Sequence, residues 1–98
     1  VLPTIGKDCT HVWHLFVILA EQRDALKTYL AEQGIATLIH YPLPPHLQEA
    51  YAALGFQPGQ FPIAEELAQK CLSLPLYPGM PIVHVANVAA AIRAFYFS

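Results

Sequence analysis

The sequence predicts a domain of the α/β class with a two-layer α+β arrangement, in which a small mixed sheet carries helices on one face. Three observations lead to this prediction. The 98 residues suffice for one domain with one modest core. Short apolar runs rich in β-branched and aromatic residues alternate with helical segments, in the order β-α-β-α-α-β-α. Glycine and proline clusters separate these segments, and no internal repeat interrupts them.

The first half of the chain predicts two strands around one helix. Residues 11–19 (HVWHLFVIL) are nearly all apolar, which is typical of a strand buried on both faces. Residues 22–33 repeat apolar side chains at helical spacing, and Gly34 follows where a left-handed residue caps a helix. Residues 35–39 (IATLI) then predict a second strand.

A proline-rich turn leads into two further helices. Residues 41–45 (YPLPP) should be stiff and extended, because a residue before proline is driven out of the α region. Residues 46–54 predict a short helix that Gly55 ends. Pro62 stands where the first residue of a helix belongs, and this helix continues to Cys71, which we expect on its buried face.

The last part of the chain predicts an edge strand and a final helix. Residues 71–76 (CLSLPL) read as an edge strand, because Pro75 cannot donate to a hydrogen-bond ladder. Residues 81–97 predict the final helix after a turn. The apolar residues that share one face of this helix are Val85, Val88, Ile92 and Phe95.

The composition indicates a surface that a partner covers. Hydrophobic residues make up 55% of the chain and charged residues 12%, against about 25% charged in an average soluble domain. The net charge is −2 and the basic residues form no run, so we expect no nucleic-acid partner. No stretch reads as a membrane span, and the two cysteines make no disulfide framework. We therefore expect a cytoplasmic protein.

The string IHYPLPPH (residues 39–46) holds the first candidate site. Metal binding by His40 and His46 would need a third or fourth ligand, and Glu49 is the one nearby carboxylate. The two histidines could instead satisfy local backbone groups. In a third interpretation, they and Tyr41 donate hydrogen bonds to phosphate or carboxylate oxygens. The residues alone leave the last two interpretations open.

The other chemically active residues form no recognisable motif. His11 and His14 flank Trp13 in the first predicted strand, where a histidine more often serves the core or an interface than catalysis. Cys9 and Cys71 lie in no nucleophile motif. A glycine-rich phosphate loop and zinc-knuckle spacing are both missing. We therefore predict no catalytic residue and no metal ligand.

Several motifs in order resemble those of the DegT/DnrJ/StrS sugar aminotransferases. Residues 11–18 (HVWHLFVI) look like the family strand H-V-[YW]-H-L-[FY]-V-I. Residues 39–48 are similar to its H-Y-P-x-P-L-H-x-Q segment. Residues 61–65 (FPIAE) and 72–78 (LSLPLYP) are similar to F-P-x-A-E and L-S-L-P-x-x-P. The resemblance covers roughly residues 11–80, and its specificity comes from the order and spacing of the motifs.

The resemblance implies a fold, an activity and a cofactor. Family members are pyridoxal-phosphate (PLP) enzymes of the aspartate-aminotransferase fold, and they move an amino group, usually from glutamate, to a nucleotide-linked keto sugar. Residues 1–98 would be the C-terminal small domain, without the large PLP-binding domain. That domain carries the Schiff-base lysine, and Lys7, Lys27 and Lys70 lie in no such motif. The chain alone should be inactive, with PLP bound only in the full-length enzyme.

The resemblance also implies a role for the proline turn. In the family this turn faces the cleft between the two domains, beside the nucleotide-sugar substrate. His40, Tyr41 and His46 would then be substrate-binding residues that position diphosphate or sugar oxygens. The prolines would hold these donors in place at little entropic cost.

Two departures from the family pattern affect the expected partners. Pro45 stands where the family usually has Leu, and residues 81–85 (PIVHV) replace a helix start with Thr and acidic residues. We expect this apolar helix to pack against another surface, such as the enzyme's own large domain or a second copy in a homodimer. The alternative function is a non-catalytic sensor or regulatory module that retains the same fold.

Overall fold

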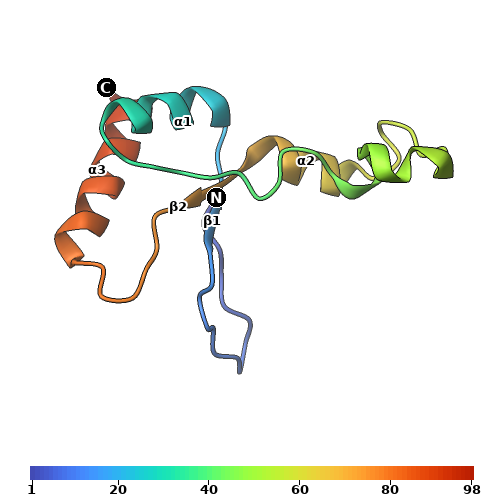
Figure 1. The fold of residues 1–98 in the computed structure, drawn as a ribbon. Helices are drawn as coiled ribbons and strands as arrows, with labels where there is room; N and C mark the ends of the chain where they lie inside the picture. Colours follow the sequence, from blue (N-terminus) through green and yellow to red (C-terminus); the bar gives the residue numbers. More distant parts are fainter.

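A computed structural model describes all of residues 1–98 (Figure 1). The elements in chain order are β1 (Phe16–Leu19), α1 (Arg23–Glu32), η1 (Pro45–Leu47), η2 (Glu49–Leu54), α2 (Pro62–Lys70), β2 (Cys71–Leu74) and α3 (Ile82–Phe97), where η denotes a 3-10 helix. The predicted α+β class is confirmed. The three α-helices begin and end within one residue of their predicted bounds.

The sheet is small and antiparallel. β1 and β2 pair antiparallel along their whole length. Residues 35–39, which we expected to form a strand, contribute only an antiparallel bridge between Leu38 and Ser73. Every pairing is therefore antiparallel, and the sheet lacks the parallel pair of the expected mixed sheet.

Pro75 limits the length of the strands. It follows the last residue of β2 and has no N–H, so the ladder does not extend past Leu74. Because Phe16 lies opposite Leu74, β1 begins at Phe16, and residues 11–15 of the predicted first strand lie outside the sheet. Pro75 also limits the bridge at Leu38 on one side, since the next hydrogen-bonded pair in that direction would place Ala36 opposite this proline.

The two faces of the sheet have different neighbours, because side chains alternate along each strand. The buried core on the face toward α1 and α3 consists of Ile18, Ala20, Leu26, Leu30 and Leu72. The strand residues that point to the opposite face are Val17, Leu19, Cys71 and Ser73. The continuous apolar run of β1 thus serves both faces. Cys71, which both the helix and the strand 71–76 were predicted to include, is the buried first residue of β2.

One side of α3 packs on the core and the other stays exposed. Of the face predicted from the sequence, Val88 is buried, whereas Val85 is half exposed. Ile92 and Phe95 pack against the core, and the Phe95 ring meets Tyr29 of α1 at a centroid distance of 5.5 Å. The large apolar residues exposed on the outer side are Ile82, Val83 and Phe97. This side is the unpartnered helix surface that the apolar helix start predicted.

Residues 46–54, predicted as one short helix, form two 3-10 helices. Gln48 separates η1 from η2 in an extended conformation, with φ −74° and ψ 144°. Neither helix has a buried residue, so packing does not offset the cost of nucleating an α-helix here. Gly55 ends η2 in the left-handed conformation, with φ 73°, as predicted.

The elements η1, η2 and α2 form an arm (residues 45–70) that projects away from α1 and α3 (Figure 1). The radius of gyration is 15.7 Å, against about 13 Å for a compact domain of similar length. The exposed large apolar residues of the arm are Tyr51, Leu54, Phe56, Phe61, Ile63 and Leu67. This open shape leaves much apolar surface to be covered. None of the helices combines the length and apolar character needed to cross a membrane.

A charged cluster joins the end of α2 to the start of α1. The Lys70 ammonium donates to carboxylates of Glu21 and Glu66, at 2.7 and 2.9 Å. These bonds, above all the one to Glu21, raise the pKa of Lys70 above its ordinary value of 10.5. The Tyr96 hydroxyl of α3 donates to the backbone carbonyl of Glu21. Burial, together with the Glu21 charge, raises the pKa of Tyr96 above 10.0.

This cluster predicts a loss of stability at alkaline pH. Both groups bind a proton more tightly in the folded chain, so their contribution is complete below about pH 10 and is lost as the pH rises through the folded pKa values. Lys70→Met should flatten the decline of the urea midpoint above pH 10. Lys27→Met, at an exposed position of α1, should leave that decline unchanged. The same slope in Lys70→Met as in the unmodified chain would contradict the prediction.

Candidate functional site

His40 and Tyr41 lie together at the start of the proline turn, over the second face of the sheet. They line a hollow of about 240 Å³. Its walls include Val17 and Leu19 from β1, Cys71 from β2, and Gln48 between η1 and η2. The sheet, the turn and the arm therefore meet at this hollow.

Ser73 holds the His40 ring in place. His40 Nδ1 lies 2.7 Å from Ser73 Oγ. Leu38 and Ser73 also exchange both backbone hydrogen bonds, at 3.2 and 2.7 Å. Residues paired across an antiparallel bridge point to the same face, and His40, two residues after Leu38, returns to that face. The position of the imidazole is therefore set by β2.

Tyr41 presents a free phenol beside this imidazole. Its side chain is 70% exposed, and no group of the chain bonds to its hydroxyl. The Tyr41 ring meets His40 edge to face, with centroids 5.3 Å apart, and the peptide bond between the two residues is cis. The Tyr41 carbonyl lies 4.0 Å from Cys71 Sγ, a weak hydrogen bond that connects the turn to β2. The two predicted donors are thus adjacent and partly open to solvent.

A short hydrogen-bond network holds the proline turn, and Pro45, predicted to be extended, is the first residue of η1. Pro44 is buried, and its carbonyl accepts the N–H of Leu47 at 3.0 Å. The Gln48 N–H donates to the Pro45 carbonyl at 3.2 Å, while its side-chain amide donates to the Leu43 carbonyl at 3.3 Å. Backbone and side-chain hydrogen bonds thus both hold the segment after Tyr41 in place.

His46 lies at the far end of the turn and does not line the hollow. Its side chain is 7% exposed, and its ring packs on Phe61 with centroids 4.8 Å apart. Its Nε2 faces Glu65 Oε2 at 3.5 Å, too long and poorly aligned for a hydrogen bond. The Glu65 carboxylate accepts the N–H of Gly59 and, more weakly, that of Phe61. The structure therefore brings His40 and Tyr41 together but places His46 where η1 meets the start of α2.

The hollow offers hydrogen-bond donors but no formal charge. None of its lining side chains is Lys, Arg, Asp or Glu. An imidazole N–H, a phenol and an amide bind sugar or phosphate oxygens, but they do not neutralise a diphosphate. Cations for such a ligand would have to come from residues outside this hollow.

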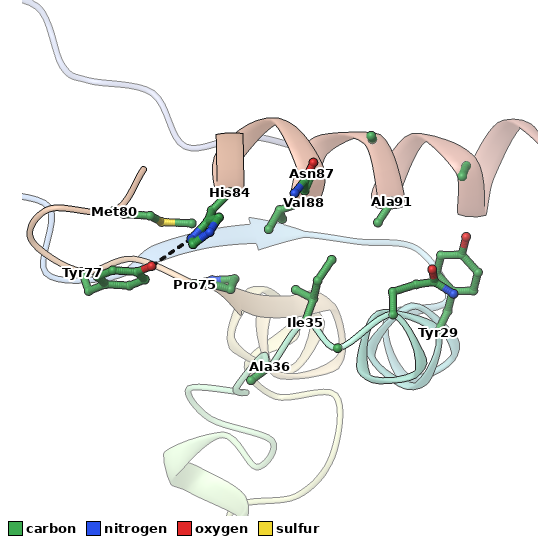
Figure 2. A pocket seen from close by; sticks show the side chains of 14 residues that line it. Tyr29, Ile35, Ala36, Pro75, Tyr77, Met80, His84, Asn87, Val88 and Ala91 are labelled. Carbon is green, nitrogen blue, oxygen red and sulfur yellow. Dashed lines mark hydrogen bonds between the residues drawn. The ribbon is translucent and has the colours of Figure 1, made fainter. Parts of the chain in front are cut away.

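A larger hollow of about 730 Å³ lies between α3 and the end of α1 (Figure 2). Figure 2 shows the Tyr77 hydroxyl and His84 Nδ1 bonded at one end, 3.0 Å apart, and Tyr29 at the other. None of the residues predicted to bind substrate lines this hollow. It is a separate surface between the two helices.

Three residues escaped prediction as site residues: Cys71 and Gln48, which line the smaller hollow, and Ser73, which bonds to His40. Strand alternation could have found two of them, because Leu72 and Leu74 read as core residues and their neighbours point the other way. Gln48 had no such signal, since the short helix expected there is not formed.

The remaining candidate residues lie away from both hollows. The His11 ring stacks on Trp13 at a centroid distance of 3.9 Å, and its Nδ1 accepts the Trp13 N–H. His14 and Cys9 are exposed. The structure contains no group of three or more His, Cys, Asp or Glu side chains that could hold a metal ion.

The comparison with known families explains this combination of fold and turn. The model of the DegT/DnrJ/EryC1/StrS aminotransferase family matches residues 1–93. The chain belongs to this family. It is 47% identical over 94 residues to the dTDP-3-amino-3,6-dideoxy-alpha-D-galactopyranose transaminase of Aneurinibacillus thermoaerophilus, covering 96% of this chain and 25% of that protein. It is 50% identical over 93 residues to the erythromycin biosynthesis sensory transduction protein EryC1 of Saccharopolyspora erythraea, covering 95% and 25%.

A solved structure has the same fold over nearly the whole chain. The chain superposes on S. venezuelae DesV, solved in complex with a ketimine intermediate, with a TM-score of 0.94 and 40% sequence identity. The match covers 99% of this chain and 26% of DesV. The expected small α+β domain of the aspartate-aminotransferase fold is confirmed. The 98-residue chain spans about a quarter of the length of the curated relatives it matches.

The lysines of this family member do not fit the binding of PLP. Lys7 and Lys27 are exposed and contact neither hollow. The Lys70 ammonium is bonded to Glu21 and Glu66, and its raised pKa keeps it protonated and therefore a poor nucleophile. No chemical step through PLP is assigned to the side chains of this chain.

Proposed function

We propose that residues 1–98 are the C-terminal small domain of a longer PLP-dependent aminotransferase, which moves an amino group from glutamate to a nucleotide-linked keto sugar. One observation carries this proposal. Nearly the whole chain is similar in sequence to about a quarter of the length of a sugar transaminase, and similar in fold to about a quarter of DesV. The large domain of the same protein would hold PLP, which supplies the electron sink of the reaction. On its own, the chain would be inactive.

The contribution of this domain is to bind and orient the sugar substrate. His40 and Tyr41 are adjacent, partly exposed and carried on a stiff turn, so they can donate hydrogen bonds to substrate oxygens without much loss of freedom. The burial of His46 and its place beside Glu65 favour a different role, which is to connect the turn to the arm. Substrate contact is therefore proposed for His40 and Tyr41.

The exposed apolar surface supports two protein partners. The arm and the outer side of α3 expose large apolar side chains, and surfaces of this kind are typical of domain and subunit interfaces. We propose that the large domain covers part of this surface and that a second copy covers another part in a homodimer. The proposed location remains the cytoplasm.

A non-catalytic sensor or regulatory module is the second candidate function. The name of the similar protein from Saccharopolyspora erythraea, which describes sensory transduction, favours it. In both candidate functions this chain would bind a ligand in the cleft between the two domains. The functions differ in what the large domain contains. A lysine able to bind PLP in that domain separates them.

A hybrid enzyme tests the proposed function. In the Aneurinibacillus thermoaerophilus transaminase, the matching quarter is replaced by this chain, to which it is 47% identical. We expect the hybrid to bind PLP, measured by absorbance, and to retain transamination of the parent's sugar nucleotide. The parent without that quarter serves as the inactive control. A hybrid that binds PLP and the sugar nucleotide but does not transaminate would contradict the aminotransferase proposal.

In the hybrid, His40→Phe should lower kcat/KM for the sugar nucleotide by about tenfold to a hundredfold. The substitution keeps a ring of similar size but removes a hydrogen bond to a polar or charged oxygen, worth about 1.5–3 kcal/mol. Tyr41→Phe removes a second such bond and should act in the same direction. His84→Phe is the matched control, because His84 lies in α3 at the other hollow. Equal kinetics for His40→Phe and His84→Phe would exclude substrate contact by His40.

A further inference from the structure

The hydrogen bond between β2 and the proline turn defines the protonation pattern of the candidate site. We infer that Ser73 is a positioning residue that holds neutral His40 in the tautomer with its proton on Nε2, so that this ring, which lines the hollow, keeps a free N–H donor. The ligand of that N–H follows from the proposed function, but the tautomer follows from the geometry of the chain alone.

Ser73 has one way to satisfy its hydroxyl. The Ser73 side chain is buried in β2, and His40 Nδ1, at 2.7 Å, is the one partner of its Oγ. If Nδ1 carried the proton, Oγ would accept it, and the hydroxyl hydrogen would be left buried without an acceptor. Leaving a buried donor unsatisfied is unfavourable, so the Ser73 hydroxyl donates and Nδ1 accepts.

Because Nδ1 accepts a hydrogen bond, the position of the proton on the His40 ring is fixed. In a neutral imidazole one nitrogen accepts and the other carries the proton, so the proton of His40 is on Nε2. Nε2 has no partner in the chain, and it is not among the buried unpartnered atoms, which are Thr37 Oγ1 and His46 Nε2. It is therefore free to donate to an acceptor such as a sugar or phosphate oxygen. In this state Nε2 cannot serve as a general base.

Nitrogen-15 NMR of the histidine-labelled chain tests the tautomer directly. The chain has five histidines, and His40→Asn identifies the signals of His40 by their loss. We expect the two-bond proton–nitrogen pattern of a ring protonated on Nε2, whereas exposed His14 supplies the pattern of a ring that averages in water. A His40 ring protonated on Nδ1, or one that averages as His14 does, would overturn the inference.

Two substitutions test whether Ser73 is the cause. In Ser73→Ala, the pattern of His40 should move toward that of His14. Thr37→Val is the matched control, because it removes a nearby buried hydroxyl that has no partner. An unchanged His40 pattern in Ser73→Ala would overturn the role of Ser73. If that variant fails to fold, the pattern of the unmodified chain still decides the tautomer.

A double-mutant cycle in the hybrid enzyme tests whether Ser73 acts through His40. Ser73→Ala should lower kcat/KM severalfold, and adding it to His40→Phe should cause no further loss, because the residue it positions is gone. Additive losses would mean a merely structural role for Ser73. If His40→Phe is without effect, the proposed substrate contact fails, and the NMR result still decides the tautomer.

Discussion

Leu72→Ala is expected to lower the free energy of unfolding by about 2–5 kcal/mol. Leu72 is 0% exposed at the centre of β2, and it belongs to one core cluster with Ile18 and Ala20 and with the α1 side chains Leu26 and Leu30. Only two other side chains, Leu26 and Leu30, are as fully buried, so removing Leu72 would leave a cavity at the centre of a small core. Because small domains are stable by about 5–15 kcal/mol at most, this single change removes a large share of the total.

Urea unfolding followed by circular dichroism measures the effect of Leu72→Ala. Leu38→Ala is the matched control, because Leu38 bridges to the same strand but is 64% exposed. We expect the midpoint to fall strongly for Leu72→Ala and little for Leu38→Ala, with similar slopes. Comparable losses for both variants would mean that the core is not centred on β2.

Arg23→Met should be the second most destabilising substitution, with an expected loss of about 2–3 kcal/mol. The Arg23 side chain is buried, and its Nη1 donates to the backbone carbonyls of Ala68 and Cys71, both at 3.0 Å. These carbonyls belong to the end of α2 and the start of β2, where a helix presents unpaired acceptors and the negative end of its dipole. Methionine keeps most of the volume but leaves both acceptors unsatisfied.

Two further variants separate the roles of charge and geometry at Arg23. Arg93→Met, on the exposed part of α3, should leave the urea midpoint unchanged. Arg23→Lys should recover only part of the stability, because one ammonium on a flexible stem does not reproduce the planar guanidinium. Full stability in Arg23→Met would show that the position of the arm does not depend on the hydrogen bonds from Arg23 to the Ala68 and Cys71 carbonyls. A loss of hydrogen-exchange protection confined to α2 would support the view that Arg23 connects α1 to the arm.

The helices of this protein follow from local patterns, and the sequence predicted them closely. Gly34 and Gly55 adopt the left-handed conformation expected where a helix ends. Pro62 occupies the first position of α2, as its fixed φ angle and missing N–H require. The stretch that became η1 and η2 was predicted less well, because none of its residues is buried and packing therefore does not stabilise an α-helix there.

The sheet and the candidate site depended on contacts that local patterns do not contain. The lengths of both strands follow from Pro75 lying across the ladder, and the register that puts it there joins residues far apart in the sequence. The string IHYPLPPH did predict a stiff turn with His40 and Tyr41 adjacent. It did not predict that His46 turns toward Glu65, because Glu65 comes from the first turn of a different helix.

The family, the three α-helices and the proline turn could be predicted from the sequence, because each depends on the order and spacing of neighbouring residues. The tertiary structure alone decided that Ser73 meets His40, that Arg23 reaches the end of α2, and that two of the three predicted binding residues share a hollow. The first two contacts join residues 33 and 45 positions apart, and the hollow is lined by residues of β1, the turn, α2 and β2. Such contacts arise only when strand pairing and burial bring distant segments together.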